Sequence, residues 1–197
     1  MDAQDWDAQD WDARYAAAEQ WSDAPNALAA ELLRDLPPGL ALDVAAGEGR
    51  MALWLASLGW QVTALDFSAT GLERGRERAE QRGLTVQWRV ADATATDLRQ
   101  EHYDLVLVLY LHLPHAPLLD VLQRSARAVA PGGRLLVLGH DCENLHRGTG
   151  GPQDAALLYD VETLRSAAAG LVIERAEQVA RPVDGRVAVD ALLLARR

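Results

Sequence analysis

The stretch that decides the fold is Leu42-Asp43-Val44-Ala45-Ala46-Gly47-Glu48-Gly49-Arg50. A short apolar segment runs into a turn of small residues, and an amphipathic pattern begins directly after the turn. Gly47 and Gly49 allow the backbone to bend tightly and let a ligand approach where a Cβ would otherwise stand. The turn also leaves backbone N–H groups open at the start of a helix. This is typical of nucleotide-binding strand–turn–helix junctions.

Further strand and helix patterns follow at regular intervals. Strands are expected at 60–66, 85–90, 103–109 and 134–139, and helices at 50–58, 69–82 and 117–129. This alternation predicts an α/β fold with a parallel sheet covered by helices on both faces. Two more strands, at 171–180 and 186–195, flank Asp184-Gly185, which is a hairpin signal. The C-terminal pair is therefore expected to be antiparallel.

An acid follows the second expected strand. Asp66 lies 19 residues after Gly47, about where a ribose-binding carboxylate follows a glycine-rich turn. The alternative is a cap for the next helix, although Ser68 could serve as that cap. Phe67 is the only Phe of the chain, and it is expected either to flank an adenine ring or to pack in the core.

These motifs resemble the class I S-adenosylmethionine-dependent methyltransferases, and most of all the small bacterial enzymes of the tellurite-resistance type. The resemblance rests on the loop from Asp43 to Gly49, on Asp66, on Asp92 after the third strand, and on Pro131-Gly132-Gly133 before the fifth. It implies a Rossmann-like, seven-stranded, mostly parallel sheet with a C-terminal antiparallel hairpin, and S-adenosylmethionine as cofactor. It also implies that Asp92 accepts the adenine amine, where the alternative is a turn cap.

The first glycine of the family loop is replaced by Ala45. Ala is the smallest replacement, so cofactor binding is expected to survive unless position 45 requires a positive φ. Arg14 is expected to bind the methionine carboxylate, with a solvated surface Arg as the alternative. The expected cofactor-binding residues are Arg14, Asp43, Ala45, Gly47, Gly49, Asp66, Phe67, Asp92, Ala93 and Leu109.

Acceptor-binding residues are expected beyond the fourth and fifth strands, where open α/β sheets bind ligands. The candidate catalytic residues there are Tyr110, His112, His115 and His140. His can remove a proton from a neutral acceptor near neutral pH. The alternative is that some of these His residues only hydrogen-bond the loop backbone. His112-x-x-His115, with the nearby Cys142, has metal-ligand types but not a metal-site spacing, and no metal is expected.

Composition limits the function classes. The 197 residues suit one domain, taken as 12–197, after an N-terminal extension at 1–11 that is expected to be flexible. The net charge of −10 disfavours nucleic acid as a partner, and the absence of a long apolar run disfavours a membrane. A single Cys fits a reducing compartment, so a cytoplasmic location is expected. The oligomeric state is left open.

The expected function is methyl transfer from S-adenosylmethionine to a small-molecule nucleophile, namely a thiol, a metalloid oxyanion or a small phenol. One alternative is a protein that binds S-adenosylmethionine without turnover. The other is an NAD-dependent oxidoreductase, because Gly47 to Ala52 also fits a nicotinamide-cofactor fingerprint. That interpretation leaves Asp92 and Pro131-Gly132-Gly133 without a role.

Overall fold

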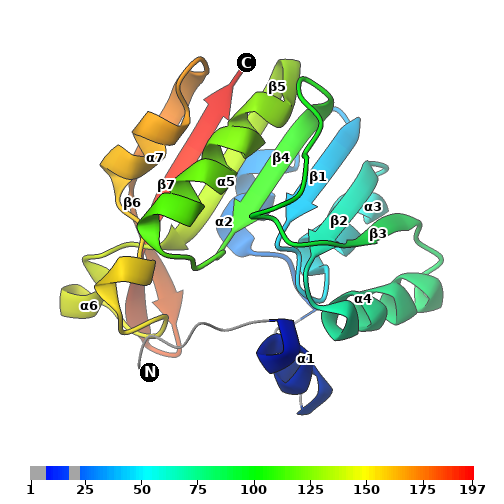
Figure 1. The fold of residues 1–197 in the computed structure, drawn as a ribbon, viewed down its shortest axis with the longest axis horizontal. Helices are drawn as coiled ribbons and strands as arrows, with labels where there is room; N and C mark the ends of the chain where they lie inside the picture. Colours follow the sequence, from blue (N-terminus) through cyan, green and yellow to red (C-terminus); the bar gives the residue numbers. More distant parts are fainter. Residues whose placement is uncertain (1–7, 18–22) are drawn as a thin grey trace. The chain divides into compact units, whose positions relative to one another are not determined.

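The computed structural model describes residues 8–17 and 23–197 (Figure 1). Its helices are α1 (Ala8–Ala17), α2 (Ala27–Leu33), α3 (Arg50–Ser57), α4 (Ala69–Gln81), α5 (His115–Ala128), α6 (Asn144–Arg147) and α7 (Val161–Ala167), with a 3-10 turn at Ala155–Leu157. Its strands are β1 (Leu40–Val44), β2 (Gln61–Asp66), β3 (Val86–Val90), β4 (Tyr103–Leu109), β5 (Val129–His140), β6 (Val172–Val183) and β7 (Arg186–Arg196).

The seven strands form one sheet in the order β3-β2-β1-β4-β5-β7-β6. β1 pairs parallel with β2, and β2 pairs parallel with β3, whereas β7 is antiparallel to both β5 and β6. The expected fold class, with its C-terminal antiparallel hairpin, is confirmed. Asp184 and Gly185 both have positive φ, as the tight turn between two twisted strands requires.

The chain divides into two compact units, and β4 begins in one and ends in the other. The first unit contains residues 8–17, 23–97 and 103–105. Its helices α3 and α4 pack on β2 and β3, and α1 packs on α4. The core there is aliphatic, and its fully buried side chains include Leu33, Leu42, Leu53, Leu55, Leu65 and Leu105.

The second unit contains residues 98–102 and 106–197. Helices α5 and α7 lie side by side in Figure 1, where α5 packs on β5 and α7 packs on β6 and β7. Its core is also aliphatic, with Leu107, Leu118, Leu122, Leu135 and Leu136 fully buried. No helix in the described parts of the chain is long and apolar enough to cross a membrane.

Two helices begin directly after a residue whose side chain caps the first turn. The Asn26 side chain accepts a hydrogen bond from the Ala29 amide at the start of α2, and Ser68 accepts one from the Gly71 amide at the start of α4. The leading residues suggest a first helix at 11–21, whereas α1 begins at Ala8, inside the extension that was expected to be flexible. Residues 1–7 of the expected extension, and 18–22 of the expected helix, lie outside the described residues.

The fifth strand is longer than the apolar pattern indicates. It was expected at 134–139, after a turn at Pro131-Gly132-Gly133, but β5 begins at Val129. The Gly132 amide donates to the Arg197 carbonyl, and the Arg197 amide donates to the Gly133 carbonyl. This pairing with the end of the chain places the Pro-Gly-Gly segment within β5, although Gly132 has a positive φ of 83°.

Candidate functional site

The glycine loop, residues 45–49, joins β1 to α3 in the first unit. Ala45, Gly47 and Gly49 all have positive φ, at 59°, 57° and 73°. A Cβ at Gly49 would lie 2.6 Å from the ring of Trp88, so this glycine is required by space as well as by conformation. The loop therefore presents open backbone at the carboxyl end of β1, where a dinucleotide-like ligand binds in this class of sheet.

Position 45 does adopt the left-handed conformation, which is the condition under which Ala is a poor substitute for Gly. The exception stated for Ala45, a positive φ, is therefore met. A left-handed residue with a Cβ costs about 1 kcal/mol or more relative to Gly.

Asp66 organises the loop. One carboxylate oxygen accepts a hydrogen bond from the Gly47 amide at 2.8 Å, and the other accepts one from the Ser68 amide at 2.8 Å. The side chain is buried, which raises the pKa of Asp66, while the two amide donors act in the opposite direction. Ser68, and not Asp66, supplies the side-chain cap of α4.

A second buried acid lies at the end of β1. Burial, the nearby Asp66 charge and only partial compensation by the Ala52 amide and Arg50 raise the pKa of Asp43 to about 7. Its Oδ2 has no hydrogen-bond partner among the described residues. An unpaired buried oxygen is costly unless a ligand or water satisfies it. This orphaned atom beneath the glycine loop fits a site for a polar ligand.

Helix α1 is tied to the start of α4. Asp12 Oδ1 accepts hydrogen bonds from the Ser68 hydroxyl at 2.5 Å and from the Thr70 amide at 3.0 Å. No motif in the sequence points to Asp12. The Arg14 guanidinium lies 4.7 Å from the Trp11 ring centroid, so Arg14 is not a fully solvated side chain.

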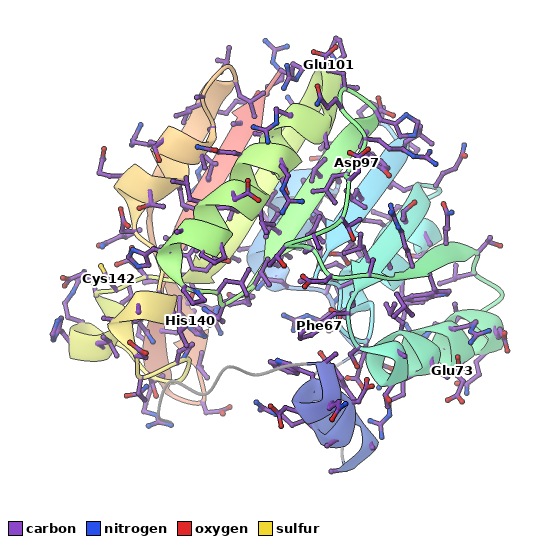
Figure 2. All side chains as sticks on the ribbon, viewed as in Figure 1. Phe67, Glu73, Asp97, Glu101, His140 and Cys142 are labelled. Carbon is purple, nitrogen blue, oxygen red and sulfur yellow. The ribbon has the colours of Figure 1, made fainter. Side chains whose placement is uncertain are left out.

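The remaining residues expected to bind the cofactor range from exposed to buried. Phe67, labelled in Figure 2, is half-buried where β2 meets α4. Asp92 is exposed, and its Oδ1 accepts from the amide and hydroxyl of Thr94, which is the alternative role of a turn cap. Ala93 is buried and Leu109 is half-buried.

The second unit contains a cluster of rings, which we call the aromatic cluster: Tyr110, His112, His140 and Tyr159. The His112 and His140 rings stack with centroids 5.5 Å apart, and the Tyr110 ring lies 5.2 Å from His140. Three of the four expected catalytic residues are thus together. His115 is exposed at the first turn of α5 and makes no ring contact with this cluster among the described residues.

Asp190 on β7 is the residue that sequence reasoning missed. Its buried carboxylate accepts from the Tyr110 hydroxyl at 2.8 Å and from Arg181 Nε at 2.6 Å, and it lies 3.2 Å from His140 Nδ1. Burial alone would raise the pKa of Asp190, but hydrogen bonds from His140, Arg181 and Tyr110 hold it below its usual value. A usable signal was present, because Asp190 is the only charge in the apolar run 187–195.

His112 is fixed in one tautomer. Its Nδ1 lies 2.9 Å from the Leu157 carbonyl oxygen, which only accepts, so Nδ1 carries the proton and Nε2 keeps a lone pair. Burial lowers the pKa of His112 to about 4. The ring is therefore neutral at physiological pH.

Other candidates are less suited to chemistry. Burial, together with the adjacent Asp141 carboxylate, raises the pKa of the Cys142 thiol, so it is not an activated nucleophile. The described residues contain no group of three His, Cys, Asp or Glu side chains placed to hold a metal ion.

The comparisons show which proteins this geometry is similar to. A family model described as a methyltransferase domain matches residues 41–133, which include the glycine loop, Asp66 and Asp92. Over these residues the chain is similar to the methyltransferases. The cofactor of this family is S-adenosylmethionine, and the loop with positive φ, the acid after β2 and the orphaned oxygen of Asp43 fit it.

Particular relatives support the methyltransferase assignment. A demethylmenaquinone methyltransferase of Thermus thermophilus is 36% identical over 112 residues, covering 56% of this chain and 51% of that one. A solved structure titled for the conversion of a disulfide bond into a thioacetal group during echinomycin biosynthesis is 26% identical, with a TM-score of 0.69 over 88% of this chain and 82% of that one. TehB of Haemophilus influenzae is 17% identical with a TM-score of 0.75, over 96% and 66% of the two chains, and shares the fold.

The chain spans only part of its curated relatives. It covers 39% of an uncharacterised Mycobacterium bovis protein that is 36% identical over 110 residues, and about half of the Thermus enzyme. The family match ends at residue 133, before His140, Arg181 and Asp190. The match therefore says nothing about the role of these three residues.

The strain at Ala45 gives a stability prediction. Ala45→Gly should raise the free energy of unfolding by about 1 kcal/mol, because glycine adopts the left-handed conformation without a Cβ clash. The melting temperature should rise by about 3 °C. The control is Ala46→Gly, since Ala46 does not have a positive φ, and this change should lower stability. Equal effects of the two substitutions would contradict strain at Ala45.

The raised pKa of Asp43 gives a pH prediction. Between pH 4 and about 7 the folded protein keeps a proton on Asp43 that the unfolded chain has released, so wild-type stability falls as pH rises through this window. Asp43→Asn has no such proton. In urea unfolding, the variant should gain stability relative to wild type by up to about 1.4 kcal/mol per pH unit across the window. A difference that is the same at pH 4 and pH 8 would show that Asp43 is not buried as a neutral acid.

Proposed function

We propose that this protein transfers a methyl group from S-adenosylmethionine to a small-molecule nucleophile: a thiol, a metalloid oxyanion or a small phenol. The observation that carries the proposal is Asp66, which braces the glycine loop through the Gly47 amide and follows the second strand of the family domain. The polar aromatic cluster of the second unit supports a site for a small acceptor.

The residues divide the work between binding and proton removal. Asp66 accepts the ribose hydroxyls, Phe67 flanks the adenine, and Arg14 binds the methionine carboxylate after leaving Trp11. When bound, S-adenosylmethionine supplies an electrophilic methyl group on a sulfonium. The enzyme then mainly aligns the acceptor and excludes water. A neutral acceptor must also lose a proton, which a histidine of the aromatic cluster accepts.

The net charge of −10 argues against nucleic acid as the acceptor. We propose one domain over residues 12–197, located in the cytoplasm. We propose no membrane or metal partner for it. The names of relatives do not decide the acceptor. The Thermus relative is named for demethylmenaquinone, but the family match leaves out His140, Arg181 and Asp190. A protein that binds S-adenosylmethionine without turnover remains the second candidate, because the cofactor side is better marked than the acceptor side.

Calorimetry tests the cofactor. S-adenosylmethionine and S-adenosylhomocysteine should bind in the micromolar range, while NAD and NADP should give no appreciable signal. Asp66→Ala should weaken binding by roughly one to two powers of ten, through the loss of charge-assisted hydrogen bonds. The control is Asp97→Ala, an exposed acid of the same unit, which should bind like wild type.

Tight NAD binding without a response to S-adenosylmethionine would overturn the proposal. An unchanged dissociation constant in a folded Asp66→Ala protein would remove Asp66 from the site. Methyl transfer from labelled S-adenosylmethionine to thiols, phenols, selenite or tellurite then separates an enzyme from a protein that only binds the cofactor.

A further inference from the structure

We propose that Asp12 on α1 is a positioning residue for the cofactor, which holds the Asp66 carboxylate in place through Ser68. Docking of α1 on α4 and binding of S-adenosylmethionine then strengthen each other. This inference rests on the proposed function, in which Asp66 binds the ribose. It adds a residue that lies outside the matched residues 41–133, and it concerns the first unit alone, which contains α1, α4 and the glycine loop.

Ser68 joins the two carboxylates. Its hydroxyl donates to Asp12 Oδ1 at 2.5 Å, and its amide donates to Asp66 Oδ1 at 2.8 Å. The second oxygen of Asp66 accepts a hydrogen bond from the Gly47 amide at 2.8 Å. Ser68 is fully buried, so its polar groups depend on these partners and not on bulk water. An unbroken chain of hydrogen bonds therefore runs from α1 to the glycine loop.

Asp12 binds the first turn of α4 through more than one hydrogen bond. Its Oδ1 also accepts from the Thr70 amide at 3.0 Å. The hydrogen bond from the Ser68 hydroxyl lowers the pKa of Asp12 below its usual value, so the carboxylate is ionised at neutral pH. Hydrogen bonds to an ionised acceptor are roughly twice as strong as neutral ones, and the positive end of the α4 dipole favours a negative charge there. A neutral side chain at position 12 would hold Ser68 less firmly.

A second link between α1 and the glycine loop runs through Arg74 on α4. Its Nη1 donates to Glu48 Oε1 at 3.3 Å, and its Nη2 donates to the Ala16 carbonyl oxygen at 3.3 Å. The Glu48 carboxylate is buried and also lies 3.5 Å from Arg78 Nη2. Glu48 is the residue after Gly47, whose amide is held by Asp66. The position of α1 is therefore linked to two neighbouring residues of the glycine loop.

Helix α1 and the glycine loop also pack against the same residue of α4. A Cβ at Gly71 would lie 3.0 Å from Cε2 of Tyr15 and 3.3 Å from the Gly47 carbonyl oxygen. Tyr15 is buried, so withdrawal of α1 would expose its ring and open a void beside Gly71. The link between α1 and the loop is therefore steric as well as polar.

The consequence for the cofactor follows from linkage. The ribose hydroxyls bind Asp66 well only if its carboxylate is held in one orientation. With Asp12 on Ser68, this carboxylate is already ordered before the cofactor binds, and such preorganisation improves affinity. The coupling is reciprocal, so the bound cofactor stabilises the docked position of α1 by the same factor.

Calorimetry on the full chain tests this with two probes, S-adenosylhomocysteine and its 2′-deoxy analogue. Asp12→Ala should weaken binding of S-adenosylhomocysteine by roughly 10-fold, and of the 2′-deoxy analogue by less than about 3-fold, because the effect acts through the ribose contact. Asp12→Asn keeps an oxygen for Ser68 and Thr70, so it should lose less affinity than Asp12→Ala. The control Asp10→Ala removes the same charge from an exposed position of α1 and should bind both probes like wild type.

Hydrogen exchange provides a readout that a merely structural role of Asp12 would not change. In wild type, saturating S-adenosylhomocysteine should slow amide exchange in α1 by roughly 10-fold, the size of the coupling expected from calorimetry. In Asp12→Ala, the same ligand at saturation should change the exchange of α1 by less than about 2-fold, because the link to Asp66 is cut.

Four outcomes would overturn the inference while leaving the cofactor assignment intact: wild-type affinity in Asp12→Ala, equal losses for the two probes, equal losses in Asp12→Ala and Asp10→Ala, or α1 exchange in wild type that does not respond to the ligand. Failure of wild type to bind S-adenosylhomocysteine would instead count against the proposed function itself, and against this inference with it.

Discussion

The arrangement of the cofactor side depends on one carboxylate. Asp66 accepts a hydrogen bond from the Gly47 amide with one carboxylate oxygen and one from the Ser68 amide with the other. A single side chain therefore joins the glycine loop to the start of α4. Ser68 in turn donates to Asp12, which holds α1. Removing Asp66 would leave two buried N–H groups unpaired, at a cost of about 1 to 3 kcal/mol each. Each carboxylate oxygen has more than one lone pair, so the same group retains acceptor capacity for a ligand.

In the second unit, the buried carboxylate of Asp190 also joins separate parts of the chain. Asp190 collects donors from Tyr110 and Arg181 and lies against His140, which come from three different elements. Tyr110 has a φ of 57°, which is rare for a bulky side chain and is kept only where the surroundings enforce it. Its hydroxyl bond to Asp190 is one such constraint.

Much of the fold could be predicted because it follows from local patterns. The apolar runs, the caps at Asn26 and Ser68, and the Asp184-Gly185 turn each act within a few residues. The extension of β5 back to Val129 was not predicted, because Arg197, which pairs with the Pro131-Gly132-Gly133 segment, is more than sixty residues away. The strain at Ala45 could not be predicted from the residue type, because the path of the loop, and not alanine itself, determines the φ of this residue.

The site divides in the same way. The glycine loop and Asp66 carry a motif, so sequence spacing was sufficient to find them. The aromatic cluster and its charged neighbours were only partly predicted. Tyr110, His112 and His140 follow or end parallel strands, where ligand-binding residues were expected. Asp190 and Arg181 lie within the C-terminal hairpin, where no ligand-binding residue was expected. His115 was included only because it is close in sequence to His112. The unmatched charge inside the apolar strand β7 was the signal that pointed to Asp190.

The central claim is that Asp66 both braces the loop and binds the cofactor ribose. The most direct measurement is the calorimetric affinity of S-adenosylhomocysteine and of its 2′-deoxy analogue for wild type and for Asp66→Asn. Loss of the hydroxyl should weaken binding to wild type by about 10-fold or more, and to the variant by less than about 3-fold, because the hydroxyl has already lost its charged partner there. An equal loss in both proteins would show that Asp66 only supports the loop and does not touch the ribose.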